Sequence, residues 1–212
     1  MTYLTMNQRQ RILASLLWGV LILAMLGAVG TVLWGRVRQA APQANVVSEA
    51  PAVLYPAPSF SLTDQEGRSF SSESLRGKTW VANFIFTNCP GACPMMSQKM
   101  ASLQKAVSDE NVRFVSFTVD PETDTPEVLK QYGQRFGADG ARWHFLTGEK
   151  GEMFRIAAEM KLSALPAEGT NPIVHSEKFL LVDKDGNVRR AYDSDDEEDI
   201  KRLVKDAAAL GS

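Results

Sequence analysis

The feature that most constrains this chain is an uncharged run near its N-terminus. Residues 12–34 are 23 amino acids without a charge, rich in Leu, Val, Ile, Ala and Gly. At about 1.5 Å per residue, a helix of this length crosses the roughly 30 Å hydrocarbon core of a bilayer. The run is longer than the apolar part of a cleavable signal peptide, and no small-x-small cleavage pattern closes it. We therefore expect an uncleaved transmembrane anchor at 12–34, after a short tail at 1–11.

The remainder of the chain divides into a linker and a folded domain. Residues 35–57 are rich in proline and alanine and show no sustained periodicity, which predicts a flexible linker. Residues 58–212 show the alternating patterns of regular secondary structure. Two arginines precede the uncharged run and two follow it, so the count of positive charges does not orient the anchor.

The patterns in 58–212 predict an α/β domain. Trp80–Phe86 and Val112–Val119 are nearly continuous apolar runs, as expected of strands that are buried on both faces. Strands separated by helices pair in parallel, whereas the short Asp185-Gly186 turn predicts a final antiparallel hairpin. A first hairpin is expected over residues 60–70. This order predicts a mixed sheet flanked by helices, and the thioredoxin-like fold is one solution. The expected helices begin near Pro94, Thr125, Glu149 and Glu197.

Composition excludes several classes of function. The chain has 23 Lys and Arg against 25 Asp and Glu, a formal net charge of −2. Nucleic-acid-binding proteins show a clear basic excess, so we expect no nucleic-acid partner. Two cysteines and two histidines exclude a disulfide-rich scaffold and a four-cysteine zinc site.

Both cysteines lie in one short loop. Cys89 and Cys93 follow the first buried strand and precede the helix at Pro94. Ligands bind at such strand ends in α/β sheets, and the N-terminus of a helix favours thiolate over thiol. Three interpretations follow: two buried structural cysteines, a redox dithiol, or a soft-metal site. Two thiolates suit Cu(I), and an added histidine can also hold Cu(II).

The histidines and nearby aspartates are the other candidate site residues. His144 lies inside a short strand, where a structural role is expected. His175 lies in a loop before a strand; in a thioredoxin-like sheet that loop faces the dithiol loop, so His175 is the better third ligand. Asp120 and Asp124 follow a strand end near the cysteines. We interpret Asp124 as part of a turn that starts a helix.

Four motifs in the same order resemble the Sco/SenC family, the membrane-anchored copper proteins that assist cytochrome c oxidase assembly. The family's Cys-x-x-x-Cys-Pro is present as Cys89 to Pro94. Its Asp-Pro-x-x-Asp-Thr-Pro is present as Asp120 to Pro126. Its Leu-Thr-Gly and its His-Ser before a strand follow as Leu146 to Gly148 and His175-Ser176. The resemblance runs from about Pro58 to the C-terminus.

The resemblance implies a metallochaperone rather than an enzyme. Cys89, Cys93 and His175 would bind copper, as Cu(I) or Cu(II), for delivery to the dinuclear copper centre of cytochrome c oxidase. The implied partners are the copper-bearing oxidase subunit, other copper chaperones and thiol reductants. The alternative is a thiol–disulfide oxidoreductase with Cys89 and Cys93 as its redox-active pair, which reduces disulfides in the oxidase copper site or in another carrier. That activity does not need His175.

The resemblance also implies a location. The family places this domain on the outer side of its membrane. No Arg- and Ser-rich transit segment precedes the uncharged run, which favours a bacterial protein. We therefore expect a single-pass inner-membrane protein with its domain in the periplasm.

Overall fold

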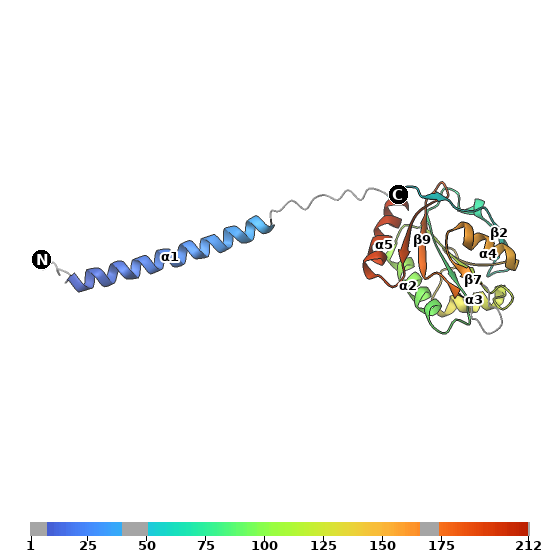
Figure 1. The fold of residues 1–212 in the computed structure, drawn as a ribbon, viewed down its shortest axis with the longest axis horizontal. Coiled ribbons are helices and arrows are strands. Elements are labelled where there is room, and N and C mark those ends of the chain that lie inside the picture. The colour runs from blue at the N-terminus through green and yellow to red at the C-terminus, as the bar shows by residue number, and fades with distance from the viewer. Residues whose placement is uncertain (1–7, 40–50, 166–173, 212) are drawn as a thin grey trace. The chain divides into compact units, whose positions relative to one another are not determined.

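The computed structural model describes residues 8–39, 51–165 and 174–211. The chain divides near residue 47 into an N-terminal unit, which holds one long helix, and a compact domain (Figure 1).

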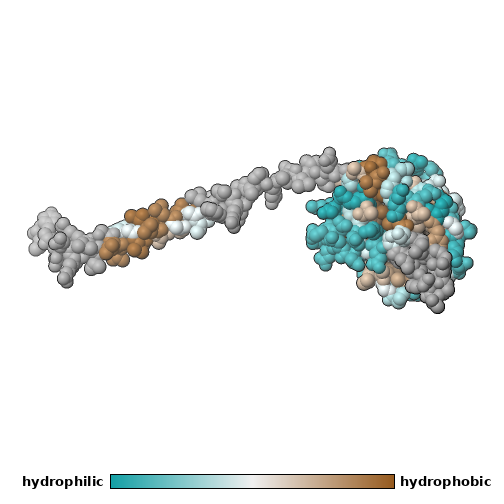
Figure 2. Space-filling model, in the orientation of Figure 1, coloured by the Kyte–Doolittle hydropathy of each residue, from teal (hydrophilic) through white to brown (hydrophobic). Residues whose placement is uncertain are grey.

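The N-terminal unit is helix α1, Gln8–Gln39. Its described side chains run from 16 to 31 and include large apolar residues that are more than half exposed, such as Leu16, Leu23 and Val29. Figure 2 shows this apolar stretch along the helix. In the part of the chain that the structure describes, no helix has both the length and the apolarity that a membrane crossing requires. The anchor at 12–34 is thus not confirmed and stays a prediction.

The domain is built on one eight-stranded mixed sheet with the strand order β1-β10-β9-β4-β5-β6-β2-β3. Strands β4, β5 and β6 are parallel, and β9 and β2 flank them in antiparallel pairing. A separate two-stranded sheet pairs β7 with β8. The bounds of the elements are β1 Tyr55–Pro56, β2 Ser61–Asp64, β3 Ser69–Ser71, the 3₁₀ helix η1 Ser72–Leu75, β4 Trp80–Ile85, α2 Ala92–Ala106, β5 Arg113–Thr118, α3 Pro126–Arg135, β6 Trp143–Thr147, α4 Lys150–Glu159, β7 Ala164–Leu165, β8 Val174–His175, β9 Lys178–Val182, β10 Asn187–Asp193 and α5 Glu197–Gly211.

Helices cover both faces of the sheet, which confirms the predicted mixed sheet flanked by helices. Helices α2, α3 and α5 pack on one face, around residues such as Val81 and Phe114 (Figure 1). Helix α4 packs on the other face, around Phe84 and Phe117. All six residues of β4 are buried, as its continuous apolar run predicts.

The domain also contains a strand inside the segment that was expected to be a linker. Tyr55 and Pro56 form β1, which pairs with Val188 and Asn187 of β10 at the edge of the sheet. The Tyr55 hydroxyl donates to the Met160 carbonyl at 2.8 Å. Proline is tolerated in an edge strand because one side of that strand needs no ladder hydrogen bond. The folded domain therefore begins before residue 58.

Candidate metal centre

The two cysteines lie where β4 leads into α2. Helix α2 begins at Ala92, two residues before the expected start at Pro94, so Cys93 falls in its first turn. Cys93 is fully buried, whereas Cys89 is half-buried. Neither cysteine forms a disulfide within the described residues. The dithiol thus has one accessible sulfur and one enclosed sulfur.

Short backbone contacts hold the two sulfurs close together. The Cys93 amide donates to Cys89 Sγ at 3.4 Å, and the Phe86 amide donates to Cys93 Sγ at 3.4 Å. The Cys89 amide in turn donates to the Phe86 carbonyl at 3.3 Å. Two adjacent soft donors at a strand end form a set that fits a soft metal ion such as Cu(I).

Burial changes the acid chemistry of the inner thiol. Burial raises the pKa of Cys93 far above its ordinary value, and the neighbouring Cys89 and Asp124 raise it further, while the Phe86 amide lowers it. Desolvation is the largest cause of this shift, so at Cys93 it opposes the preference for thiolate that we expect from a helix N-terminus. A metal ion bound here must displace the thiol proton, so binding and pH are coupled.

Asp124 accepts hydrogen bonds from Thr87, which precedes the dithiol loop. Its side chain is fully buried and accepts from the Thr87 amide at 3.1 and 3.3 Å and from the Thr87 hydroxyl at 2.5 Å. It also accepts from the Thr118 hydroxyl at 2.5 Å. Burial raises the pKa of Asp124, and the hydrogen bonds from Thr118 and Thr87 oppose that shift.

The interpretation of Asp124 as a helix-start residue holds for its backbone only. Its amide donates to the Asp120 carbonyl at 2.8 Å, which closes the turn before α3. The N-cap of α3 is Thr125, whose side chain accepts from the Val128 amide at 3.4 Å. Because Thr125 caps α3, the carboxylate of Asp124 does not act as the helix cap. Among the residues that the structure describes, the Asp120 side chain has no hydrogen-bond partner.

The backbone of His175 lies in β8, where it is paired with Ala164 of β7; its side chain lies outside the described residues. Leu180 of β9 pairs with Ala82 of β4 in antiparallel register, so β9 begins beside the end of β4. The backbone of His175 comes three residues before β9, so it lies toward the end of the sheet at which β4 leads into the dithiol loop. Within the described residues, no group of three or more His, Cys, Asp or Glu side chains forms a metal site. The ligand role of His175 stays a prediction.

His144 lies at the opposite end of the sheet. It is the second residue of β6, and β6 runs parallel to β4, so it is far along the strands from Cys89. Its ring contacts the Phe70 ring with centroids 4.5 Å apart, and its buried Nδ1 has no hydrogen-bond partner in the described part of the chain. Burial lowers the pKa of His144. The expected structural role fits this packing on β6, which lies between β5 and β2 in the sheet.

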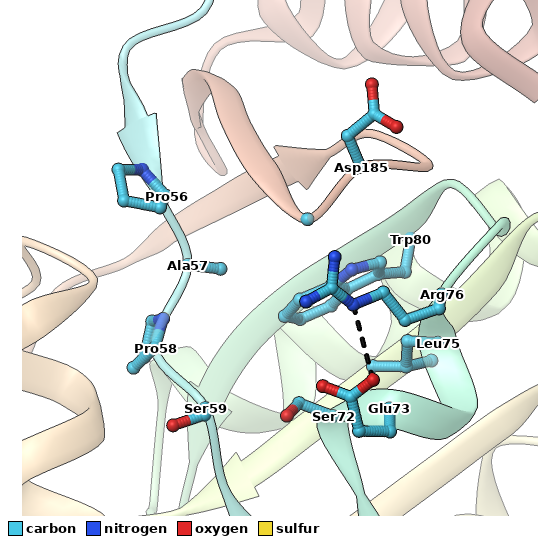
Figure 3. Close-up of a pocket in the computed structure, with 11 residues that line it drawn as sticks. Pro56, Ala57, Pro58, Ser59, Ser72, Glu73, Leu75, Arg76, Trp80 and Asp185 are labelled. Atoms are coloured by element: carbon cyan, nitrogen blue, oxygen red, sulfur yellow. Dashed lines mark ion pairs between the residues drawn. The ribbon is translucent and has the colours of Figure 1, made fainter.

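One cavity of the domain is remote from the cysteines. It has a volume of about 120 Å³ and lies among Pro56–Ser59, η1, Trp80 and the β9–β10 turn. Figure 3 shows the Arg76–Glu73 ion pair at 3.4 Å beside Trp80. Trp80 is the first residue of β4, and the dithiol follows the last, so this cavity is not part of the metal centre.

Comparison with known proteins gives the family. The SCO1/SenC family model matches residues 52–210. The SCO1 protein homolog of Bacillus subtilis is 39% identical over 158 residues, which cover 71% of this chain and 82% of that protein.

Solved structures agree with this match. The structure of BsSco, described as "a member of the Sco family of cytochrome c oxidase assembly proteins", matches with a TM-score of 0.65 and 37% identity, over 76% of this chain and 98% of that one. The structure of Bradyrhizobium japonicum ScoI with copper bound matches with a TM-score of 0.60 and 26% identity, over 73% and 97%. With its dithiol loop at the end of β4 and a family match across the whole folded domain, this chain belongs to the SCO1/SenC family.

Proposed function

We propose that this protein binds copper through Cys89, Cys93 and His175 and delivers it to the dinuclear copper centre of cytochrome c oxidase. The observation that carries the proposal is the pair of adjacent thiols at the end of β4 in a chain of the SCO1/SenC family. A related structure with bound copper and a relative described as an oxidase assembly protein support it.

The unequal burial of the two sulfurs suits a protein that must release its cargo. Cys93 is enclosed and held by the Phe86 amide, whereas Cys89 is half-buried. A partner's ligand can therefore reach the metal from the Cys89 side first, and the ion passes to the partner one donor at a time. Each sulfur gives up a proton when copper binds and regains one when it leaves.

The first test is a Cu(I) titration of the reduced full-length chain in detergent, against a chromophoric Cu(I) chelator. We expect one tightly bound Cu(I) per chain, and none in Cys89→Ser or Cys93→Ser. His175→Asn should weaken binding by at least about tenfold. His144→Asn is the matched control, since His144 lies at the other end of the sheet and should leave the affinity unchanged. Equal affinities in the two histidine variants would remove His175 from the ligand set.

The second test concerns delivery. The copper-loaded protein is mixed with the reduced, copper-free copper-bearing domain of an oxidase, and the copper spectrum of that domain is followed. We expect the metal to leave this protein and the dinuclear centre to form. Tight binding without any transfer would contradict delivery while leaving the binding site intact.

The second candidate function is thiol–disulfide exchange, which the exposure of Cys89 beside the enclosed Cys93 favours. The Cys89 thiolate would attack a partner disulfide, and Cys93 would then displace the mixed disulfide. Cys89 and Cys93 become a disulfide, and the partner gains two electrons and two protons as two thiols. Reduction of an oxidised oxidase copper domain should survive His175→Asn if this activity dominates.

We also propose that residues 12–34 anchor the protein in the inner membrane with the domain in the periplasm. The uncharged run and the exposed apolar side chains of α1 support this placement. In a bacterial host, the protein should stay with membranes after carbonate extraction, and external protease should cleave the domain in spheroplasts. Release by carbonate would contradict the anchor.

A further inference from the structure

We propose that Asp124 is a positioning residue that fixes the geometry of the two sulfurs by holding Thr87. This inference rests on the proposed copper site, since it concerns how that site is built. Asp124 acts through the turn that carries the cysteines, by its hydrogen bonds to Thr87.

The contacts converge on one residue of the turn. Both oxygens of Asp124 accept from the Thr87 amide, at 3.3 and 3.1 Å, and Oδ1 also accepts from the Thr87 hydroxyl at 2.5 Å. Two separate groups of Thr87, one on the backbone and one on the side chain, are therefore bound by one carboxylate. This fixes both the position and the rotation of Thr87.

The neighbouring residue connects Thr87 to both cysteines, to the sulfur of Cys93 and to the backbone amide of Cys89. Phe86 precedes Thr87, and its amide donates to Cys93 Sγ at 3.4 Å. Its carbonyl accepts from the Cys89 amide at 3.3 Å. The peptide group between Phe86 and Thr87 thus carries one contact to a cysteine and one to Asp124, so a rotation of Thr87 moves the sulfurs.

The carboxylate itself is held from the next strand. Asp124 Oδ2 accepts from the Thr118 hydroxyl at 2.5 Å, and Thr118 ends β5, which pairs in parallel with β4. The Thr118 hydroxyl also accepts from the Asp120 amide at 2.9 Å. Asp124 is fully buried, so these bonds are not exchanged with bulk water. Through Asp124, the end of β5 is therefore joined by hydrogen bonds to the turn that follows β4 and carries the cysteines.

A purely structural role would be a weaker account of the same residue. The start of α3 is already capped by Thr125. The bonds of Asp124 join segments that are 37 residues apart in the chain, and they end two residues before Cys89. The structure therefore assigns the side chain to the dithiol loop and not to the helix that follows it.

The variants are Asp124→Asn, which keeps the shape but replaces one acceptor by a donor, and Thr87→Val, which removes only the hydroxyl. Thr87→Ser keeps both donors and should behave like the native protein. Asp183→Asn is the matched control. Asp183 is also a buried carboxylate in a turn, where it accepts from the Asp185 and Asn187 amides at 3.0 and 2.8 Å, but it follows β9 at the other end of the sheet.

The first measurement uses the metal-free full-length chain in detergent, equilibrated with glutathione buffers, and gives the equilibrium constant of the Cys89–Cys93 disulfide. We expect Asp124→Asn to shift this constant by about tenfold toward the dithiol, because a looser turn brings the sulfurs together less often. Thr87→Val should shift it in the same direction by less. The second measurement is Cu(I) affinity, where we expect a loss of about tenfold for Asp124→Asn.

The outcomes separate cleanly. If Asp124→Asn and Thr87→Val match Asp183→Asn in both measurements, the positioning role is overturned. If Asp124→Asn does not fold, Thr87→Val against Thr87→Ser decides the question alone. If the native protein binds no Cu(I), the proposed copper function fails, but the disulfide equilibrium still reports whether Asp124 positions the sulfurs.

Discussion

Two buried aspartates lie in turns at opposite ends of the sheet, and they are held in different ways. Asp183 follows β9 at the end where β4 begins, and it pairs with Arg189 at 2.8 Å. Burial raises the pKa of Asp183, but hydrogen bonds from Asn187, Arg189 and Asp185 outweigh it and leave the pKa below its ordinary value. At the dithiol end, burial leaves the pKa of Asp124 above its ordinary value.

The difference is the presence of a cation. The hydrogen-bond donors to Asp124 among the described residues are an amide and two hydroxyls, all neutral. An arginine at this position would stabilise the carboxylate, but it would also place a positive charge beside the sulfurs. A fixed positive charge repels Cu(I), and it also lowers the pKa of nearby thiols. The turn of Asp183 is therefore stabilised by an ion pair with Arg189. The turn of Asp124 is held by neutral hydrogen-bond donors, so it brings no fixed positive charge to the cysteines.

The largest expected effect follows from this contrast. Asp183→Asn should lower the free energy of unfolding by about 1.5–3 kcal/mol, because it removes charge-assisted hydrogen bonds and the ion pair with Arg189. Asp124→Asn should cost less, about 1 kcal/mol, because its donors are neutral. Urea unfolding of both variants at neutral pH measures the difference. A greater loss for Asp124→Asn would contradict the explanation that the charged partner of Asp183 makes it the more stabilising of the two aspartates.

Much of this arrangement follows from the sequence. The nearly continuous apolar run at Trp80–Phe86 predicts a strand that is buried on both faces, and the structure confirms this strand as β4, Trp80–Ile85. Thr125 followed by Pro126 predicts a helix start, and both residues take those places in α3. These signals are local, so the sequence displays them directly. The pairing of the two cysteines in one loop after a strand is equally local.

The remainder depends on contacts between distant residues. The bond of Asp124 to Thr87 joins positions 37 apart, and no periodicity encodes it. One signal was available: a threonine lies two residues after β4 and another ends β5. Because these strands are parallel, the two threonines lie at the same end of the sheet. Strand β1 escaped prediction because two residues in a proline-rich stretch carry no pattern of their own. The burial that raises the pKa of Cys93 is likewise set by packing.

The second prediction concerns the pH dependence of stability in the two aspartate variants. A carboxyl group whose folded-state pKa is lowered stabilises the fold above its unfolded pKa, and this contribution is lost as the pH falls through the folded value. For Asp183 the cost of substitution by Asn should therefore be larger at about pH 7 than at about pH 3. A group with a raised pKa behaves in the opposite way. The cost of Asp124→Asn should be larger at about pH 4 than at about pH 7. Parallel pH profiles for the two variants would show that they do not differ in charge environment.

The third prediction concerns His144, at the same end of the sheet as Asp183. Burial lowers its pKa, while Asp64 raises it and Arg113, Arg68 and Lys78 lower it. The unfolded chain therefore takes up a proton before the folded protein does, so stability should decrease as the pH falls below about 6.5. The slope has a limit of about 1.4 kcal/mol per pH unit for one proton, and partial exposure of the ring keeps it smaller.

The measurement for His144 is urea unfolding between about pH 7 and pH 5. His144→Phe keeps the stacking on Phe70 and removes the titrating group, so the slope in this range should flatten. Copper affinity at neutral pH should be unchanged in this variant. A slope that persists in His144→Phe would mean that another group carries it.

The smallest expected effect separates Asp124 from the helix beside it. Thr125→Ala removes the N-cap of α3 and should cost about 0.5 kcal/mol, at the low end for such caps because its hydrogen bond to the Val128 amide is long, at 3.4 Å. If Asp124 acted only by stabilising the start of α3, Thr125→Ala would disturb the sulfurs as Asp124→Asn does. We expect instead an unchanged disulfide equilibrium and unchanged Cu(I) affinity in Thr125→Ala, together with the small loss in unfolding free energy. Since Asp124 and Thr125 are neighbours in sequence and differ in what their side chains hold, this pair tests whether the dithiol responds to the helix or to the carboxylate.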